Sequence, residues 1–437
     1  MDDKSDVAAS VRHARYARSA HRARQHQDAH NDEAAPSPAH AVADHPDVPK
    51  NEATLVTTDD GLRDLLARLR DAGSFAYDSE FIGELTYIPK LCLIQVATKE
   101  RVELIDPLAD LDLMPFWELI ADESVEKITH AGEQDVEPVI RHTGREAKNA
   151  FDTQIAAGFI GMAYPVALSK LVAELVGAKL GKGLTFSHWD QRPLSAQQLR
   201  YAADDVRYLP ALRKAIGARV DATGHAAWAR AEFDAMCDAR LYEFNPDTAY
   251  LRVRGATTLG PQALAILREL VIWRDGVARA HDVPPRAFLK DEVLVDMSRS
   301  PVKTPEKLSR VRGLPRPVEH AHGKEIIDAV QRGIATPPGK FPFARTIEPS
   351  PTERFRGDAV WAVAQCICIG KSVDPALVTS RQEIGEFYRH VSGGREAEDL
   401  SIMKGWRREA LGEPLMKLIK EGNAVTLDWN EGALRAK

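Results

Sequence analysis

The chain has 437 residues, of which 44% are hydrophobic and 28% are charged, and its formal net charge at pH 7 is -6. This length suggests about three domains of roughly 150 residues each, and the composition is that of a globular protein rather than a wholly disordered one. Because the net charge is negative, the surface as a whole does not attract nucleic acid. Such binding would need local basic faces or bound cations.

The first ordered part of the chain has the pattern of an α/β domain. Thr58 precedes an amphipathic stretch at 61–72, a plausible capped helix. Strand-like runs and helical stretches then follow one another. The expected strands are 74–79, 90–97, 102–105, 127–131 and one near 150, and the expected helices are 115–121, 133–142, 153–161 and 168–177. The short connection at 98–101 predicts a hairpin, so we expect a mixed sheet with flanking helices.

Helices dominate the rest of the chain. Ser195-Ala-Gln-Gln198 fits a capping box and begins a helix that runs to about Val220, with Pro210 expected to kink it. Strand signals largely vanish beyond Gly255, and two helical blocks follow that are separated by a Pro-rich linker. The expected parts are a disordered tail at 1–51, the α/β domain at 52–225, a connecting segment at 226–258, helical domains at 259–334 and 353–437, and a linker at 335–352.

The start of the chain and its cysteines indicate where the protein works. The acidic start lacks the basic and apolar regions of a secretory signal, and the longest apolar run, at 359–370, is shorter than the ~20 residues that span a bilayer. The 4 cysteines show neither C-x-x-C spacing nor the spacing of zinc ligands. We therefore expect a cytoplasmic protein with reduced, buried thiols and no membrane partner.

Acidic residues occur at three places that could form a catalytic or metal-binding site. Asp78 and Glu80 are two residues apart on a predicted strand, so their side chains share a face. Asp135 follows another predicted strand, at the opening turn of a helix, where a carboxylate could instead serve the helix N-terminus electrostatically. Tyr201 and Asp205 are four residues apart on a predicted helix and hence neighbours. Asp204 is also near, and spacing alone does not decide which acid faces inward.

Electrostatics connects these residues. Two carboxylates about 4 Å apart repel by roughly 4 kcal/mol at an effective dielectric constant near 20, so a cluster of four needs cations. An all-oxygen ligand set suits two ions of Mg²⁺ or Mn²⁺ rather than Zn²⁺. Two such ions can clamp a scissile phosphate, and the neutral hydroxyl of Tyr201 could orient the attacking water.

In order and spacing, these motifs resemble the DEDD superfamily of exonucleases, in the subclass with Tyr-x-x-x-Asp (DEDDy), and most closely its ribonuclease D family. Asp78 to Phe81, His130 to Asp135 and Tyr201 to Asp205 match the three motifs, and the register selects Asp205 over Asp204. The segments 151–157 and 184–194 also match, with a departure at His188, where the family more often has an acid.

The resemblance implies an RNase H-like fold, two divalent ions, and stepwise release of nucleoside 5′-monophosphates from RNA 3′ ends. It makes Asp78, Glu80, Asp135 and Asp205 the metal ligands and Tyr201 a further catalytic residue. Phe81 would either stack on the terminal base or pack in the core. The expected substrates are precursor tRNA and other structured RNA 3′ ends, and we expect a monomer.

Both helical blocks resemble HRDC modules, which bind nucleic acid. The first carries basic residues that could contact phosphates, with only Glu306 opposing them. A solvated helical face would explain any one of them equally well. The expected substrate-binding residues are Arg299, Lys303, Lys307, Arg310 and Arg312, with Arg316 nearby.

Two other functions remain open. A DNA 3′-to-5′ exonuclease of the same subclass would use the same residues, although the tandem HRDC-like modules and the segments at 151–194 favour RNA. A nucleic-acid-binding scaffold with an inactive nuclease domain would be expected to have lost at least one acidic ligand, and all four are present.

Overall fold

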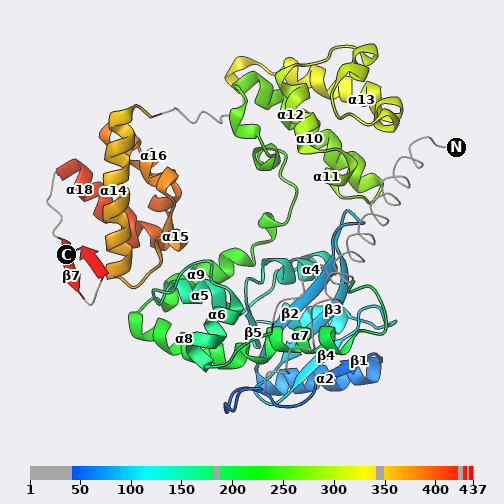
Figure 1. Ribbon diagram of the computed structural model, residues 1–437, viewed down its shortest axis with the longest axis vertical. Helices are drawn as coiled ribbons and strands as arrows, with labels where there is room; N and C mark the ends of the chain where they lie inside the picture. The colour runs from blue at the N-terminus through cyan, green and yellow to red at the C-terminus, as the bar shows by residue number, and fades with distance from the viewer. Residues whose placement is uncertain (1–41, 182–187, 341–348, 422–426, 431–432, 437) are drawn as a thin grey trace, which may run out of the picture.

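The computed structural model describes residues 42–181, 188–340, 349–421, 427–430 and 433–436. Figure 1 shows an α/β domain and two helical modules that lie apart from one another, each beside that domain. Most of the expected tail, part of the linker and the segment 182–187 lie outside the described residues. All four cysteines are buried and free, as expected. None of the described helices is both long and apolar enough to cross a membrane.

A six-stranded mixed sheet forms the centre of the α/β domain, in the order β1-β4-β3-β2-β5-β6. Its strands are β1 (Thr54–Val56), β2 (Ser74–Ile82), β3 (Lys90–Ala97), β4 (Val102–Ile105), β5 (Glu126–Thr129) and β6 (Ala150–Asp152). The pairs β2–β3 and β3–β4 are antiparallel and the other three are parallel. The mixed sheet and the hairpin at 98–101 are therefore confirmed, and β1 is a strand that the sequence did not reveal.

Helices cover both faces of the sheet. One face packs against α2 (Asp59–Ala72), α3 (Met114–Ile120) and α4 (Glu133–Thr143), and the other against α5 (Thr153–Gly158), α7 (Ala196–Arg207) and α8 (Leu209–Thr223). Successive side chains of β2 alternate between them: the Tyr77 ring lies edge-on to Phe116, 5.6 Å between centroids, whereas Ala76 packs with the α7 side. This alternation sends Asp78 and Glu80 toward α7.

Local signals define helix α2. The Thr58 side chain accepts a hydrogen bond from the Gly61 backbone N–H at its start, and Gly73, with φ 67°, ends it. Four leucines at helical spacing are buried on one side: Leu62, Leu65, Leu66 and Leu69. Burial of each contributes roughly 1.5–3 kcal/mol, so packing against the sheet stabilises this helix more than its caps do.

The helix expected from Ser195 to Val220 is two helices. The capping box between Ser195 and Gln198 is present at the start of α7. The first helix ends at Tyr208, and Pro210 lies in the first turn of α8. Proline is favoured there because its missing N–H would have no helical partner. It therefore begins a second helix rather than kinking a single one.

Residues 42–51, which we expected in the disordered tail, pack against the α/β domain. The Asn51 side chain pairs with the backbone N–H and C=O of Val102, both at 3.0 Å. The buried Arg207 guanidinium donates to the carbonyls of Pro49 and Asn51 at 2.5 and 3.1 Å. These partners are distant in sequence, so local composition could not reveal them.

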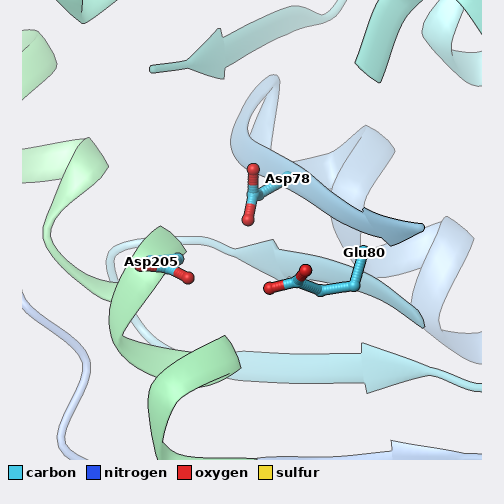
Figure 2. Close-up of side chains that lie close together, drawn as sticks. All are labelled: Asp78, Glu80 and Asp205. Carbon is cyan, nitrogen blue, oxygen red and sulfur yellow. The ribbon is translucent and has the colours of Figure 1, made fainter. Parts of the chain in front are cut away.

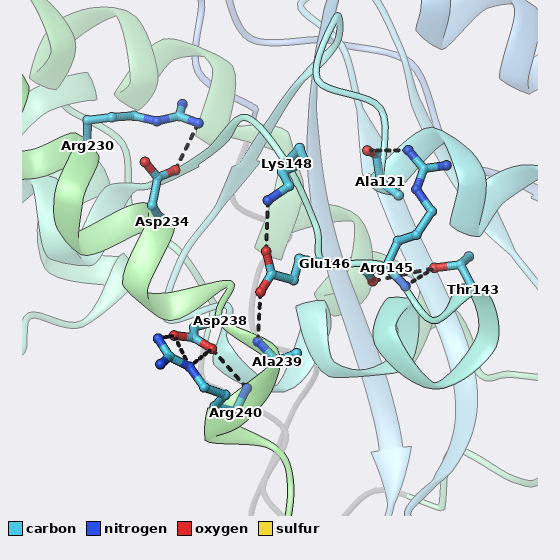
Figure 3. A network of polar contacts seen from close by, with 10 residues as sticks. All are labelled: Ala121, Thr143, Arg145, Glu146, Lys148, Arg230, Asp234, Asp238, Ala239 and Arg240. Atoms are coloured by element: carbon cyan, nitrogen blue, oxygen red, sulfur yellow. Dashed lines mark hydrogen bonds and ion pairs between the residues drawn. The ribbon is translucent and has the colours of Figure 1, made fainter.

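Helix α9 (Ala226–Met236), which we expected in the connecting segment, packs on β6 and α8. A polar network fixes its far end (Figure 3): Glu146 accepts from the Ala239 backbone N–H at 3.2 Å and pairs with Lys148 at 2.8 Å. Arg230 pairs with Asp234 along the helix at 2.9 Å. The helix is thus an integral part of the α/β domain.

The first helical module has its own core. It comprises α10 (Pro261–Ala280), α11 (Pro285–Phe288), α12 (Asp291–Arg299) and α13 (Arg316–Ile334). Tyr87, in the loop between β2 and β3, contacts it: its hydroxyl donates to Asp275 at 2.8 Å, and its backbone N–H donates to Asp282 at 3.0 Å. Arg279 lies over the Tyr87 ring, 5.0 Å from its centroid. The module is therefore attached to the loop that follows Asp78 and Glu80 in the chain.

The C-terminal module docks on the α/β domain. Its helices are α14 (Pro351–Gly370), α15 (Pro375–Val378), α16 (Arg381–Ser392), α17 (Gly405–Arg407) and α18 (Glu413–Glu421). Glu232 of α9 accepts from the Trp406 indole at 2.7 Å and from both terminal nitrogens of Arg407 at 2.7 and 2.9 Å. Trp406 also stacks on Trp228, with 5.5 Å between ring centroids.

An antiparallel pair of strands, β7 (Leu427–Asn430) and β8 (Ala433–Ala436), follows α18, so strands are present where we expected helices alone.

Replacing Glu232 should loosen this docking. Glu232→Ala leaves the guanidinium and the indole N–H without their acceptor, and hydrogen bonds that involve a charged group contribute on the order of 2 kcal/mol each. We expect faster hydrogen exchange in α9 and α15 and an earlier calorimetric transition. Asp234→Ala, which removes an exposed ion pair two residues further along the same helix, is the matched control. Equal effects of the two variants would contradict the assignment.

Candidate active site

Strand β2 carries two carboxylates toward helix α7. Asp78 and Glu80 occupy alternate positions and so point to the same side. The register with β3 shifts between Glu80 and Phe81. Such an irregularity turns the strand locally, so it separates the two acids from the loop that reaches the first helical module.

Helix α7 supplies the opposing side chains. Tyr201 and Asp205 lie one turn apart, and the neighbouring Ala202 and Val206 are fully buried against the sheet. The Asp204 side chain points elsewhere and pairs with Arg207, with 3.1 Å between Oδ1 and Nε. Asp205 is therefore the inward acid, in agreement with the motif register.

Three of the expected carboxylates form one group. Figure 2 shows Asp78 and Glu80 extending from β2 toward Asp205 of α7, and carboxylate oxygens of these three residues all lie within 4.8 Å of one another. The sequence separation is more than 120 residues, so the group exists only in the folded protein.

Asp135 lies beside this group but is not one of its three members. It belongs to the first turn of α4, where its carboxylate accepts a hydrogen bond from the Ser79 hydroxyl and its backbone carbonyl accepts one from the Tyr77 hydroxyl at 2.8 Å. Its charge nevertheless acts on Asp78 and Glu80. The fourth acid thus shares the electrostatic environment of the group while it is held by β2.

A buried acid that was not among the predicted site residues holds the turn before Asp135 in place. Asp152, at the end of β6, accepts from the Gly132 backbone N–H at 2.9 Å and from the Thr129 hydroxyl at 3.0 Å. It also caps α5. A Cβ on Gly132 would lie 2.6 Å from Thr129, so this turn has no room for a side chain. The N-cap position of Asp152 before a predicted helix was the available signal.

The carboxylates hold protons unusually strongly. Burial, followed by Asp205 and Asp135, raises the pKa of Glu80 to about 8. Burial raises the pKa of Asp205 to about 7, against a hydrogen bond from Tyr201 that lowers it. The pKa of Asp135 is about 7, also mainly because of burial. Burial and the three other acids raise the pKa of Asp78 well above its usual value. Without cations, the group is therefore partly protonated near neutral pH.

Tyr201 is a neutral hydroxyl beside the group. Burial, then the charges of Asp205 and Glu80, raise its pKa well above the usual value. Its ring lies near Trp189, with 6.2 Å between centroids. A phenol in this state can both donate and accept a hydrogen bond.

The donor set fits divalent cations. It consists of carboxylate oxygens from a rigid strand and a capped helix, and hard ions such as Mg²⁺, Mn²⁺ and Ca²⁺ take oxygen ligands. A bound cation would also remove the repulsion that now favours protonation. Asp78, Glu80 and Asp205 could hold it directly, with Asp135 close by.

Comparisons with family models identify the class of protein to which the chain belongs. A family model described as 3′-5′ exonuclease matches residues 53–221, and a model of the HRDC domain matches residues 263–330. The chain therefore has a 3′-5′ exonuclease domain followed by a helical HRDC domain, which agrees with the mixed sheet and the first helical module.

Similar proteins then identify the family. The chain is 32% identical to ribonuclease D of Nitrobacter hamburgensis over 83% of this chain and 94% of that protein. It is 33% identical to ribonuclease D of Gluconacetobacter diazotrophicus over 86% and 94%. The crystal structure of Escherichia coli RNase D, an exoribonuclease involved in structured RNA processing, superposes with a TM-score of 0.72 at 28% identity, over 85% of this chain and 99% of that one. The chain belongs to the ribonuclease D family.

The expected substrate-binding residues lie in two places. Phe81 is half-buried just beyond the register shift of β2. The basic residues belong to the HRDC domain, far along the chain, and are exposed: Arg299, Lys303, Lys307, Arg310 and Arg312. Leu308, fully buried, anchors the 3-10 turn Pro305–Arg310 that carries two of them.

The raised pKa values make stability depend on pH. For an acid whose pKa is higher in the folded state, the stabilisation is complete below the unfolded pKa and is lost as pH rises through the folded pKa. In EDTA, the melting temperature should therefore fall as pH rises from about 4.5 to about 8, the window that Glu80 defines. The melting temperature of Asp205→Asn, in which the repulsion is lower, should fall less over the same window when it is measured by calorimetry in parallel. An identical pH dependence of both proteins would contradict the electrostatic account.

Proposed function

We propose that this chain is a 3′-to-5′ exoribonuclease that releases nucleoside 5′-monophosphates from RNA 3′ ends, in tRNA 3′ maturation and stable-RNA processing. The observation that carries this proposal is the group of Asp78, Glu80 and Asp205, in a chain of the ribonuclease D family. The cytoplasmic location and the monomeric state expected from the sequence stay predictions.

The proposed catalytic roles follow from position. Asp78, Glu80 and Asp205 would hold two divalent cations, Mg²⁺ or Mn²⁺, with Asp135 as the fourth DEDDy carboxylate. The chemistry that two such ions supply is activation of the attacking water and stabilisation of the leaving 3′-oxygen. Tyr201, a neutral hydroxyl hydrogen-bonded to Asp205, would accept a hydrogen bond from the attacking water and orient it. Phe81 would contact the terminal base.

The helical modules would hold the rest of the RNA. Lys303, Lys307, Arg310 and Arg312 form no ion pair with another residue that the structure describes, so their charges are available to phosphates. Arg299 lies 3.5 Å from Asp296 and is partly compensated. We propose that the C-terminal module is a second HRDC-like domain. Its docking through Glu232 and the attachment of the first module through Tyr87 connect both modules to the α/β domain.

A chain-shortening assay tests the catalytic assignment. A 3′-extended tRNA labelled at its 5′ end should shorten one nucleotide at a time in Mg²⁺ or Mn²⁺ and stay intact in EDTA. Asp205→Asn removes a proposed ligand and should lower the rate by about 100-fold or more, and Tyr201→Phe should lower it by about 100-fold. Asp204→Asn, the adjacent acid that faces Arg207, should retain most activity.

The alternatives give different results in this assay. Single-stranded DNA of the same sequence, shortened faster than RNA, would indicate the DNA exonuclease. No shortening of either substrate with any ion would indicate a binding scaffold. Equal activity of Asp204→Asn and Asp205→Asn would show that the proposed ligand set is wrong.

The basic residues predict a separable effect on binding. Lys307→Ala with Arg310→Ala should raise KM for the tRNA substrate and leave kcat nearly unchanged, because these side chains belong to the HRDC domain and not to the group of carboxylates. Each lost phosphate contact should reduce the slope of log affinity against log salt by about 0.7 to 1. Lys324→Ala, an exposed lysine paired with Asp328 on α13, is the control. An unchanged slope would exclude the two residues from RNA binding.

A further inference from the structure

Gln95 is a buried amide with no hydrogen-bond partner. It lies in the middle of β3 and is 0% exposed, and neither its Oε1 nor its Nε2 has a partner. Among the residues that the structure describes, it is the one side chain with two such atoms. A buried polar group without a partner destabilises the folded protein, so this position would be more stable with an apolar residue of the same size.

One polar side chain lies directly opposite Gln95 in the sheet. In the β2–β3 pair Gln95 lies directly opposite Asp78, and in the β3–β4 pair it lies opposite Leu104. Directly opposite side chains share a face, with Cβ atoms about 4.5–5.5 Å apart. Its neighbours along β3 on that face are Leu93 and Ala97, which pack in apolar clusters. Of the two residues directly opposite Gln95, Asp78 is therefore the one with a polar side chain.

The amide and the carboxylate have complementary chemistry. A carboxylate accepts hydrogen bonds only, and the NH₂ of glutamine has two donors. A cation in the group would keep Asp78 ionised and leave it an oxygen that a donor can orient.

We propose that Gln95 is a positioning residue of the metal site, whose side-chain NH₂ donates to Asp78 and orients its carboxylate toward the cation. The inference rests on the metal site of the proposed function. It explains why an amide occupies a position where it destabilises the cation-free protein. Partners that orient metal ligands in this way typically change metal affinity by about 10- to 100-fold.

The test compares Gln95→Met and Gln95→Leu with wild type, using full-length protein. Mn²⁺ affinity is measured by calorimetry, and melting temperature is measured in EDTA and in Mn²⁺. We expect Mn²⁺ affinity to fall about 10- to 100-fold, the Mn²⁺-induced rise in melting temperature to shrink, and the melting temperature in EDTA to stay equal or rise. Leu93→Met, on the same face opposite Glu80, is the matched control and should bind Mn²⁺ as wild type does.

The outcomes separate this role from a structural one and from the proposed function. Unchanged Mn²⁺ affinity together with a lower melting temperature in EDTA, or failure of both variants to fold, would mean that the amide is structural and would overturn the proposal. In Asp78→Asn, adding Gln95→Met should cause little further loss of Mn²⁺ affinity, because the group that Gln95 orients is already altered. Wild-type protein that binds Mn²⁺ but shortens no RNA would overturn the proposed function and leave the role of Gln95 standing.

Discussion

Repulsion between half-buried carboxylates is the constraint on which the rest of the structure depends. Two charges about 4 Å apart repel by roughly 4 kcal/mol at an effective dielectric constant near 20, and Asp78, Glu80 and Asp205 lie within 4.8 Å of one another. The fold must hold them together before a cation arrives. It does so with β2, which is paired on both sides, and with α7, which has a capping box at its start and buried alanines against the sheet. Burial and the repulsion that remains raise the pKa values of the carboxyl groups, which therefore bind protons more strongly.

The same strand also leads to the HRDC domain. After Glu80 the register shifts, and the loop that follows places Tyr87 against Asp275 and Arg279 of the HRDC domain. A displacement of that domain would therefore act on the loop that continues from the site. The C-terminal module attaches to a different element, α9, through Glu232. The two modules thus contact the α/β domain independently of one another, through separate surfaces.

The parts of this site that periodicity determines could be predicted from the sequence, and the parts that depend on distant contacts could not. A period of two put Asp78 and Glu80 on one face, and a spacing of four put Tyr201 beside Asp205. The position of Asp135 outside the group of three depends on Ser79, 56 residues away in sequence. β1 is three residues long and is a strand because it pairs with β4, some 50 residues later. The lack of a partner for Gln95 depends on what the folded sheet places beside it, Asp78 on β2 and Leu104 on β4, which spacing does not show.

Asp204 and Asp205 show how one helix can serve two purposes. Successive residues of an α-helix point about 100° apart, so adjacent acids cannot both face the sheet. Asp205 turns inward to the carboxylate group, and Asp204 pairs with Arg207, whose guanidinium holds the carbonyls of Pro49 and Asn51. Asn51 in turn binds Val102 at the start of β4. Helix α7 therefore supplies one acid to the site and uses the next to tie the segment before β1 to the same sheet, so the geometry of the site and the packing of the N-terminal segment depend on the same helical turn.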